Sequence, residues 1–327
     1  MRKIVVDIYG ADAGIEPVVN GVAKALSGGR DFFPILVGEA ARVSALMDAA
    51  GIAADRYETI DTDQFIRHDE PPHCIFGGRD DSSMAMAYAR LKNDDECSAM
   101  LSAGSTGALL VGSICRLGLL PGLKFPALAS ALPCGFDHLV CLVDCGANMD
   151  CTVDDLVRYA KMGDVLSRCV CGIEKPRVGL MSVGRERGKG NALTKEAFEK
   201  ISELPIHFVG NVEGGDLVSG YADVIVSDGY AGNIALKCAE ASGKRAMAIV
   251  EAVGADADPD LIEKIKHELF LTFDFNSRGG ATFLGPKKTV VKMHGCANED
   301  TTVASIDQIL RLEKANFAAA IAEAMNN

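Results

Sequence analysis

Short apolar runs rich in β-branched residues recur along this chain, and segments with helical periodicity separate most of them. Runs of about four to eight such residues are typical of strands buried on both faces, and strands that alternate with helices form parallel sheets. The pattern therefore predicts an α/β fold with a mainly parallel sheet. Strands are expected at Lys3–Asp7, Phe33–Val37, Ser98–Ser102, Ala127–Leu132, Leu139–Asp144, Arg177–Val183, Ile206–Val209 and Asp223–Ser227.

The helical segments are predicted between and after these strands. Ala127–Leu132 precedes Leu139–Asp144 without an intervening helix, which indicates an antiparallel hairpin. No Pro- or Ser-rich linker, low-complexity tract or internal repeat divides the chain, so residues 1–327 are expected to form a single domain. Helices are expected at residues 15–27, 39–50, 82–92, 106–117, 152–170, 191–202, 231–253, 258–272 and 301–325.

The charge balance argues against nucleic acid as a general partner. The chain has 45 Asp and Glu against 33 Lys and Arg, a formal net charge of −12, so a general nucleic-acid-binding surface is not expected. The first residues run directly into a strand without the pattern of a signal peptide, and no apolar run approaches the roughly 18 residues of a spanning helix. We therefore expect a cytoplasmic protein.

The 11 cysteines do not form a metal-binding pattern. No C-x-x-C pair occurs, and no spacing fits a zinc site, so no structural metal is predicted. In apolar stretches a reduced cysteine behaves as a small hydrophobic residue. This interpretation applies to Cys97, Cys115, Cys141, Cys145, Cys169 and Cys238.

Polar and glycine-rich loops follow several of the expected strands. In parallel α/β sheets ligands bind at the carboxyl ends of strands, where loops lead into helices. We expect these loops to converge on one edge of the sheet. They are Asp7–Asp12, Ser102–Gly107, Gly184–Asn191, Gly210–Glu213 and Asp228–Asn233.

Two of these loops are candidates for anion binding. The Gly104–Gly107 segment opens a helix, so its backbone N–H groups can bind an anion or serve only as an ordinary hydroxyl cap. The Gly184–Asn191 loop resembles a P-loop but lacks its spacing and its hydroxyl after Lys189. Lys189 among glycines at a helix start can still neutralise a phosphate, and the alternative is a solvated basic turn.

Other familiar catalytic motifs are missing. No loop in the first half completes G-x-G-x-x-G, and no G-x-S-x-G nucleophile motif occurs. His294 lies between a strand and the last helix, where it can act as an acid or base or as a structural hydrogen-bonding group. Asn211, Glu213, Asp228 and Asn233 suit hydrogen bonding to a polar substrate, although turn and capping roles explain each one singly.

In their order along the chain, these motifs resemble the PlsX family of bacterial phosphate acyltransferases, which act in fatty-acid and phospholipid synthesis. The resemblance covers nearly the whole chain. It departs from the family pattern at Tyr9, Ala11, Gly77 and Cys296, and at Arg185 and Arg187. The matching stretches are residues 7–12, 81–84, 102–109, 144–148, 176–180, 188–191, 210–213, 227–237, 279–281 and 294–295.

The resemblance implies an enzyme that converts acyl carrier protein thioesters and inorganic phosphate into acyl phosphates, without a metal or an organic cofactor. It implies a homodimer with a three-layer α/β/α fold like that of the isocitrate dehydrogenase and phosphotransacetylase group. The implied catalytic residues are Lys189, Asn191, Asn211, Asp228 and Asn233. The implied substrate-binding residues are Asp7, Gly10, Asp12, Ser82, Ser83, Gly104, Ser105, Thr106, Gly107, Gly188, Gly190, Glu213, Gly229, Gly232 and His294.

Within this hypothesis each group has an expected task. Lys189 neutralises phosphate charge, and the glycine loops at 104–107 and 188–190 supply backbone donors. The three asparagines hydrogen-bond phosphate or the acyl oxygen, while Asp228 and Glu213 orient those donors.

Two surfaces are expected to meet partners. Residues 156–200 carry ten Lys or Arg against five Asp or Glu, a local excess that can attract an acidic carrier protein. The apolar spacing of residues 261–273 indicates dimer or core packing, or peripheral contact with the inner membrane face, where a downstream glycerol-3-phosphate acyltransferase would act. Rival functions are a short-acyl (acetyl or butyryl) phosphotransacylase that uses coenzyme A, an acyl-phosphate-forming subunit of a reductase complex, and a catalytically weak paralogue that binds acyl carrier protein.

Overall fold

The computed structural model describes residues 2–135, 138–254, 257–274 and 278–326. The chain divides into two compact units: unit 1 comprises Met1–Pro126 and Gly279–Ala322, and unit 2 comprises Ala127–Arg278 and Glu323–Asn327. The single domain expected for residues 1–327 stays a prediction.

Unit 1 contains a mainly parallel sheet. Its strand order is β3-β2-β1-β4-β11-β10, in which β10 alone runs antiparallel to its neighbour β11. Apolar side chains of β1, β4 and β11 are fully buried because helices cover the sheet on both sides. The strands are β1 (Arg2–Asp7), β2 (Phe32–Gly38), β3 (Glu58–Asp61), β4 (Cys97–Ser102), β10 (Ala281–Leu284) and β11 (Thr289–Lys292).

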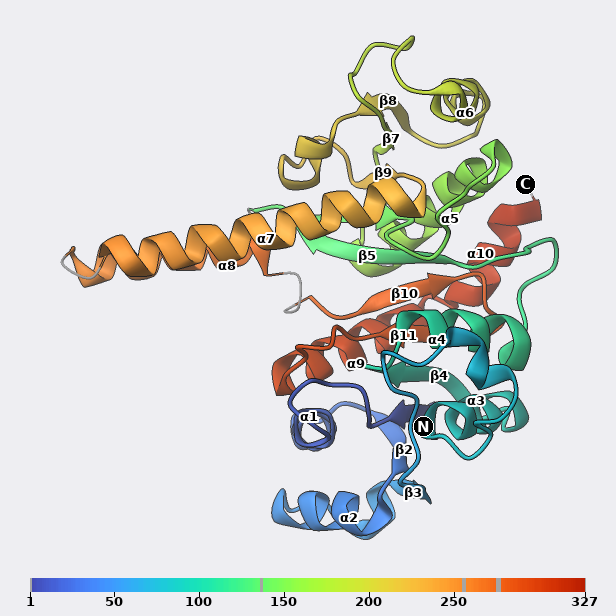
Figure 1. The fold of residues 1–327 in the computed structure, drawn as a ribbon, viewed down its shortest axis with the longest axis vertical. Coiled ribbons are helices and arrows are strands. Elements are labelled where there is room, and N and C mark those ends of the chain that lie inside the picture. Colours follow the sequence, from blue (N-terminus) through green and yellow to red (C-terminus); the bar gives the residue numbers. More distant parts are fainter. Residues whose placement is uncertain (1, 136–137, 255–256, 275–277, 327) are drawn as a thin grey trace. The chain divides into compact units, whose positions relative to one another are not determined.

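The helices of unit 1 form the two outer layers. Helices α1 (Glu16–Ser27), α2 (Ala40–Ala49) and α9 (Glu299–Lys314) lie on one face of the sheet, and α3 (Ser83–Asn93) and α4 (Thr106–Gly112) lie on the other (Figure 1). In α1 the buried residues Val18, Val22 and Leu26 recur at helical spacing, so one side of the helix faces the core. Shorter elements are Ala54–Arg56, Pro72–Phe76 and a π-helical turn at Ser113–Leu117, and α10 spans Phe317–Asn326.

The strands of unit 2 follow one another in the order β5-β6-β9-β7-β8. Strands β5 and β6 form the expected antiparallel hairpin, and β6, β9, β7 and β8 are parallel to one another. The carboxyl ends of these four strands therefore lie at the same edge of the sheet. The strands are β5 (Ala127–Pro133), β6 (Leu139–Val143), β7 (Val178–Met181), β8 (Phe208–Val212) and β9 (Val224–Val226).

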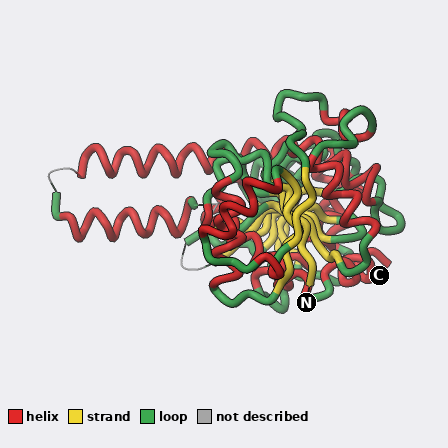
Figure 2. The backbone as a smooth tube through the Cα atoms, turned by 90° about the horizontal axis from the view of Figure 1, so that it is seen from below, coloured by secondary structure: helices red, strands yellow, loops and turns green. Residues whose placement is uncertain are grey.

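Two kinds of helix accompany the sheet of unit 2. Helices α5 (Val153–Cys171) and α6 (Ala192–Ser202) pack together, and a short turn spans Gly214–Val218. Helices α7 (Gly229–Val253) and α8 (Pro259–Phe273) lie side by side as a long hairpin that extends beyond the sheet (Figure 2). Within the described chain, no helix is long and apolar enough to cross a membrane.

The expected elements are largely confirmed, with corrections to three strands, one helix and two cysteines. Strands β3, β10 and β11 were not among the expected strands, because each has only four residues. The single helix expected at 301–325 is two helices, interrupted where Asn316 adopts a left-handed conformation with φ 52°. Cys115 and Cys238, expected to be buried, are exposed because their helical positions face away from the core.

Candidate functional site

The carboxylate of Asp7 organises the loop edge of unit 1. Asp7 is the last residue of β1 and is 1% exposed. One oxygen accepts a hydrogen bond from Ser83 Oγ at 2.6 Å, and the other accepts one from Ser102 Oγ at 2.7 Å. Burial raises the pKa of Asp7 to about 6, although both hydroxyl groups oppose that shift. The carboxylate therefore joins the ends of β1 and β4 to the start of α3.

The two expected loops of unit 1 are in direct backbone contact. Gly10 has φ +101°, and a Cβ there would lie 2.5 Å from the Gly104 backbone nitrogen. Only glycine allows this approach without moving one of the loops. The Gly104 N–H in turn donates to Ser102 Oγ at 3.0 Å. The structure therefore brings Asp7, Gly10 and Gly104 together.

The remaining hydroxyl candidates of unit 1 lie at helix starts. Ser82 caps α3 and accepts a hydrogen bond from the Ala85 N–H. Ser105 precedes the first residue of α4, Thr106, and makes no side-chain cap hydrogen bond. Gly107 lies in the first turn of α4 against Pro72. The hydroxyl of Ser82 is therefore engaged in capping, whereas that of Ser105 is not.

His294 lies in the turn after β11, at the same edge of the unit 1 sheet. Its Nδ1 is 3.1 Å from Cys296 Sγ. The Asp12 N–H donates to the Gly295 backbone oxygen at 2.7 Å, which holds this turn against the first loop. Asp12 and His294 are thus in neighbouring loops.

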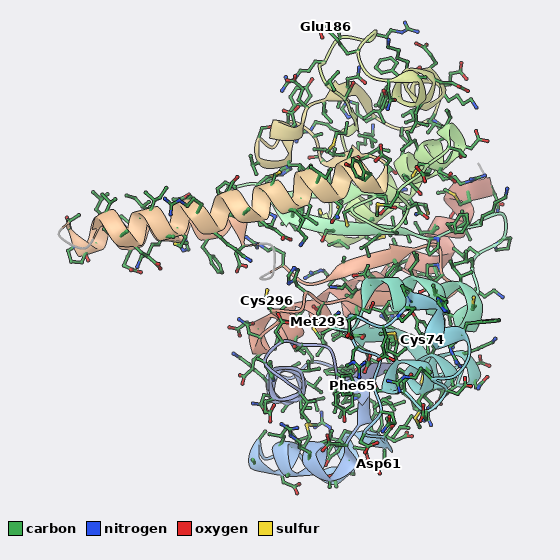
Figure 3. All side chains as sticks on the ribbon, viewed as in Figure 1. Asp61, Phe65, Cys74, Glu186, Met293 and Cys296 are labelled. Carbon is green, nitrogen blue, oxygen red and sulfur yellow. The ribbon has the colours of Figure 1, made fainter. Side chains whose placement is uncertain are left out.

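In unit 2, side chains from the end of β8 and from the segment between β8 and β9 hold the Gly184–Asn191 loop. Asn211 Nδ2 donates to the Glu186 backbone oxygen at 2.9 Å. Arg185 pairs with Asp216 at 2.7 Å, and its guanidinium lies 4.2 Å from the centre of the Tyr221 ring. The loop therefore has a defined position at the carboxyl ends of β7 and β8 (Figure 3).

Within this loop Lys189 is exposed, and its ammonium group has no hydrogen-bond or ion-pair partner among the described residues. Gly188 and Gly190 flank it. Asn191 caps α6, since its Oδ1 accepts a hydrogen bond from the Thr194 N–H at 2.9 Å. The lysine is therefore available to an anion, whereas the asparagine oxygen is already engaged.

Two buried polar atoms lack partners beside this loop. Asn211 is 2% exposed, and neither its Oδ1 nor the buried Ser182 Oγ has a hydrogen-bond partner within the described chain. Ser182 follows β7, and Asn211 pairs with Leu180 of that strand, so the two side chains point to the same face of the sheet. Buried polar atoms without protein partners are uncommon, and such atoms bind an ordered water or a hydrogen-bonding ligand.

The start of α7 packs against the loop that follows β6. Asp228 caps α7 by accepting a hydrogen bond from the Ala231 N–H at 2.7 Å, and the Gly229 N–H donates to the Asn148 backbone oxygen. A Cβ at Gly232 would lie 2.0 Å from the Asp144 backbone oxygen, so only glycine fits there. Asn233 lies beside Gly146 in the same loop.

Asp144 shapes this loop. It is fully buried, and its carboxylate accepts hydrogen bonds from the Gly146 and Ala147 N–H groups at 2.9 Å and from the Asn148 N–H at 2.8 Å. Burial raises its pKa, while these backbone donors oppose the shift.

Glu213 has a similar local role, because it caps the turn at Gly214–Val218. No site role was predicted for the side chains of Ser102, Asp144 or Ser182. Their signal was the position of a polar residue directly at the end of a buried strand.

The structure therefore brings the predicted residues together in two groups, one in each unit. Convergence of all five loops on one edge stays a prediction, as do the individual roles assigned to the residues. Among the residues that the structure describes, no group of three or more His, Cys, Asp or Glu side chains could hold a metal ion.

Comparison with known proteins confirms the family and the fold class. A phosphate acyltransferase of Bacillus cereus is 36% identical over 314 residues, which cover 94% of this chain and 93% of that protein. One of Streptococcus uberis is 34% identical and covers 100% of this chain and 98% of that protein. A phosphotransacetylase structure from Streptococcus pyogenes matches 100% of this chain and 95% of that chain, with a TM-score of 0.63 and 18% identity. A family profile described as "Fatty acid synthesis protein" matches residues 2–320, and the chain therefore belongs to that family.

Proposed function

We propose that this chain transfers an acyl group from an acyl carrier protein thioester to inorganic phosphate, which yields an acyl phosphate for phospholipid synthesis. The relatives named phosphate acyltransferase support acyl transfer to phosphate and the prediction of an enzyme. The proposal goes beyond the names of these relatives in one respect, because it takes acyl carrier protein as the acyl donor.

The observation that carries the proposal is the Lys189 loop of unit 2. An exposed ammonium group without an ion-pair partner in the described chain lies in a glycine loop at the start of an 11-residue helix. Both the lysine charge and the helix N-terminus favour an anion. The unpartnered Asn211 Oδ1 can accept a hydrogen bond from the protonated oxygen of hydrogenphosphate.

The chemistry that follows needs positioning more than activation. Hydrogenphosphate is already a nucleophile. Its oxygen attacks an acyl thioester carbonyl to give a tetrahedral oxyanion, which then expels a thiolate. Lys189 reduces the charge repulsion during the attack, and Asn233 supplies a side-chain donor. Asp228 and Glu213 keep their loops in place as helix caps.

The assay that tests the proposal measures phosphate-dependent release of free thiol from a long-chain acyl carrier protein and, in parallel, from acetyl coenzyme A. Hydroxylamine traps the acyl phosphate. We expect release from the carrier-protein substrate. Release from acetyl coenzyme A alone would replace the proposal by a short-acyl phosphotransacylase, and release from neither substrate would favour a non-catalytic binding protein.

The basic segment 156–200 is less positive than its composition indicated. Many of its cations pair with carboxylates that lie outside the segment, such as Asp216 and Asp223, so the net excess overstates the local field. Within the described residues, four lysines of the segment make no ion pair. They are Lys161, Lys175, Lys189 and Lys195.

These lysines support docking of an acidic carrier protein on unit 2. Charge reversal at Lys175 should raise the KM for acyl carrier protein by roughly two- to fivefold, since one exposed charge contributes up to about 1 kcal/mol. The increase should shrink as salt is added. A KM that stays unchanged at low salt in Lys175→Glu and Lys195→Glu would exclude this surface.

The α7–α8 hairpin supports a homodimer. Helix α8 has no buried residue. The interpretation of its apolar spacing as core packing is therefore wrong. Exposed apolar side chains along both helices remain for a second copy of the chain or for a membrane surface. They are Ile234, Ile249, Val253, Leu261, Ile265 and Phe270.

A further inference from the structure

The turn after β11 pairs an exposed thiol with an imidazole. Cys296 is exposed (Figure 3). Its Sγ lies 3.1 Å from His294 Nδ1. The Cys296 N–H also donates to Nδ1, at 3.3 Å. Because a backbone N–H can only donate, Nδ1 must present its lone pair, which corresponds to the neutral tautomer with the proton on Nε2. The thiol therefore faces the basic nitrogen of the ring.

The pair has a defined place in the fold. The turn that carries it immediately precedes α9. Contact between Gly295 and the Asp12 backbone holds the turn at the loop edge of unit 1. Thus the pair has a fixed position among the predicted substrate-binding residues.

Exposure alone does not distinguish this cysteine. Cys115 and Cys238 are also exposed, but neither thiol has a hydrogen-bond partner in the part of the chain that is described. Only Cys296, of these three, has a base in contact with its sulfur. Cys115 is therefore a matched control for thiol reactivity.

We propose that Cys296 accepts the acyl group from the thioester and carries it as a covalent intermediate, with His294 as the base. The Cys296 sulfur attacks the thioester carbonyl, a new C–S bond forms, and the bond to the carrier sulfur breaks. His294 takes the Cys296 proton and passes it to the departing carrier thiolate.

In the second step a phosphate oxygen attacks the acyl group on Cys296. The C–O bond of the acyl phosphate forms, the C–S bond to Cys296 breaks, and the proton of hydrogenphosphate returns through His294 to the cysteine. The sum is the acyl transfer proposed above, and this inference rests on that function.

The test separates the intermediate from the overall reaction. Wild type, Cys296→Ser and Cys115→Ser are mixed with an acyl thioester in the absence of phosphate, and intact mass followed by peptide mapping locates any acyl adduct. We expect an adduct on Cys296 in wild type and in Cys115→Ser, and its loss in Cys296→Ser. His294→Gln should form the adduct at least about 100-fold more slowly, which is the usual contribution of a positioned base.

Phosphate is then added to the isolated adduct. We expect acyl hydroxamate after hydroxylamine trapping, at a rate no slower than steady-state turnover. Two outcomes overturn the intermediate and leave the proposed function intact: wild type forms acyl phosphate without a Cys296 adduct, or wild type forms acyl phosphate while phosphate does not consume the adduct. If wild type makes an adduct but no acyl phosphate under any condition, both the intermediate and the proposed function fail. Acyl phosphate formation by wild type therefore distinguishes failure of the intermediate alone from failure of both.

Discussion

The side-chain nitrogen of Asn211 donates a hydrogen bond to the Glu186 backbone oxygen at 2.9 Å, and this contact joins the end of β8 to the Lys189 loop. Replacement of Asn211 by Ala removes the contact, which should lower the free energy of unfolding by about 1 kcal/mol and raise the KM for phosphate. Asn211→Asp should cost more, because a buried carboxylate would face a carbonyl oxygen. Urea unfolding and phosphate titration measure both effects; equal stability of the two variants would contradict this argument.

Lys189→Ala should abolish phosphate-dependent turnover while stability changes by less than about 0.5 kcal/mol, because the ammonium group is exposed and makes no ion pair within the described residues. Thermal unfolding and the thiol-release assay provide the two readouts. Lys92→Ala, at an exposed position of α3, is the matched control and should retain turnover. Normal turnover by Lys189→Ala would remove the lysine from the proposed mechanism.

The buried Asp7 carboxyl should make stability depend on pH. Its pKa is about 6 in the folded protein against 3.8 for the free group, so the folded state retains a proton that the unfolded chain releases. This contribution to stability is complete below about pH 3.8 and is lost as the pH rises through about 6. For a shift of about two pH units it amounts to roughly 3 kcal/mol.

Asp7→Asn removes that titration. As the pH rises from about 4 to about 7, the free energy of unfolding of wild type should therefore fall by up to roughly 3 kcal/mol relative to that of Asp7→Asn. Urea unfolding across this range tests it, with the exposed Asp31→Asn as a control. Parallel pH profiles for wild type and Asp7→Asn would show that the carboxyl does not hold its proton.

Gly232→Ala should destabilise unit 2, because the added methyl group would lie 2.0 Å from the Asp144 backbone oxygen and would displace the first turn of α7. We expect a loss of at least about 2 kcal/mol, as for other overpacked sites. Gly215→Ala introduces the same group into open space and should be nearly neutral. Denaturant titration of the two variants distinguishes this steric argument from a general cost of replacing glycine.

Phe270→Asp should weaken self-association. Phe270 is 46% exposed on α8, and a carboxylate in an apolar interface between two copies would lose its hydration without a partner. Light scattering after gel filtration should give a dimer for wild type and a larger monomer fraction for the variant. Flotation with anionic vesicles tests the alternative, in which wild type binds lipid and the variant does not. A wild-type monomer would remove the homodimer from the proposal.

The positions of the strand-end loops were predictable because local periodicity alone locates buried strands and the helices between them. Asp7, Gly104 and Asn211 were identified in this way, since each stands where an apolar run ends. The break at Asn316 was not predictable from periodicity, because the residues on both sides continue a helical pattern and a single left-handed residue interrupts it.

The sequence did not predict which residues of distant segments contact each other. Its pattern identifies Asp7 and Ser102 as strand-end residues, but their hydrogen bond across 95 positions depends on the order of strands in the sheet. In the same way the unpartnered oxygen of Asn211 becomes visible only after every neighbouring donor has been placed. Local propensities act over a few residues, whereas burial and hydrogen bonding at these sites depend on elements brought together by tertiary packing.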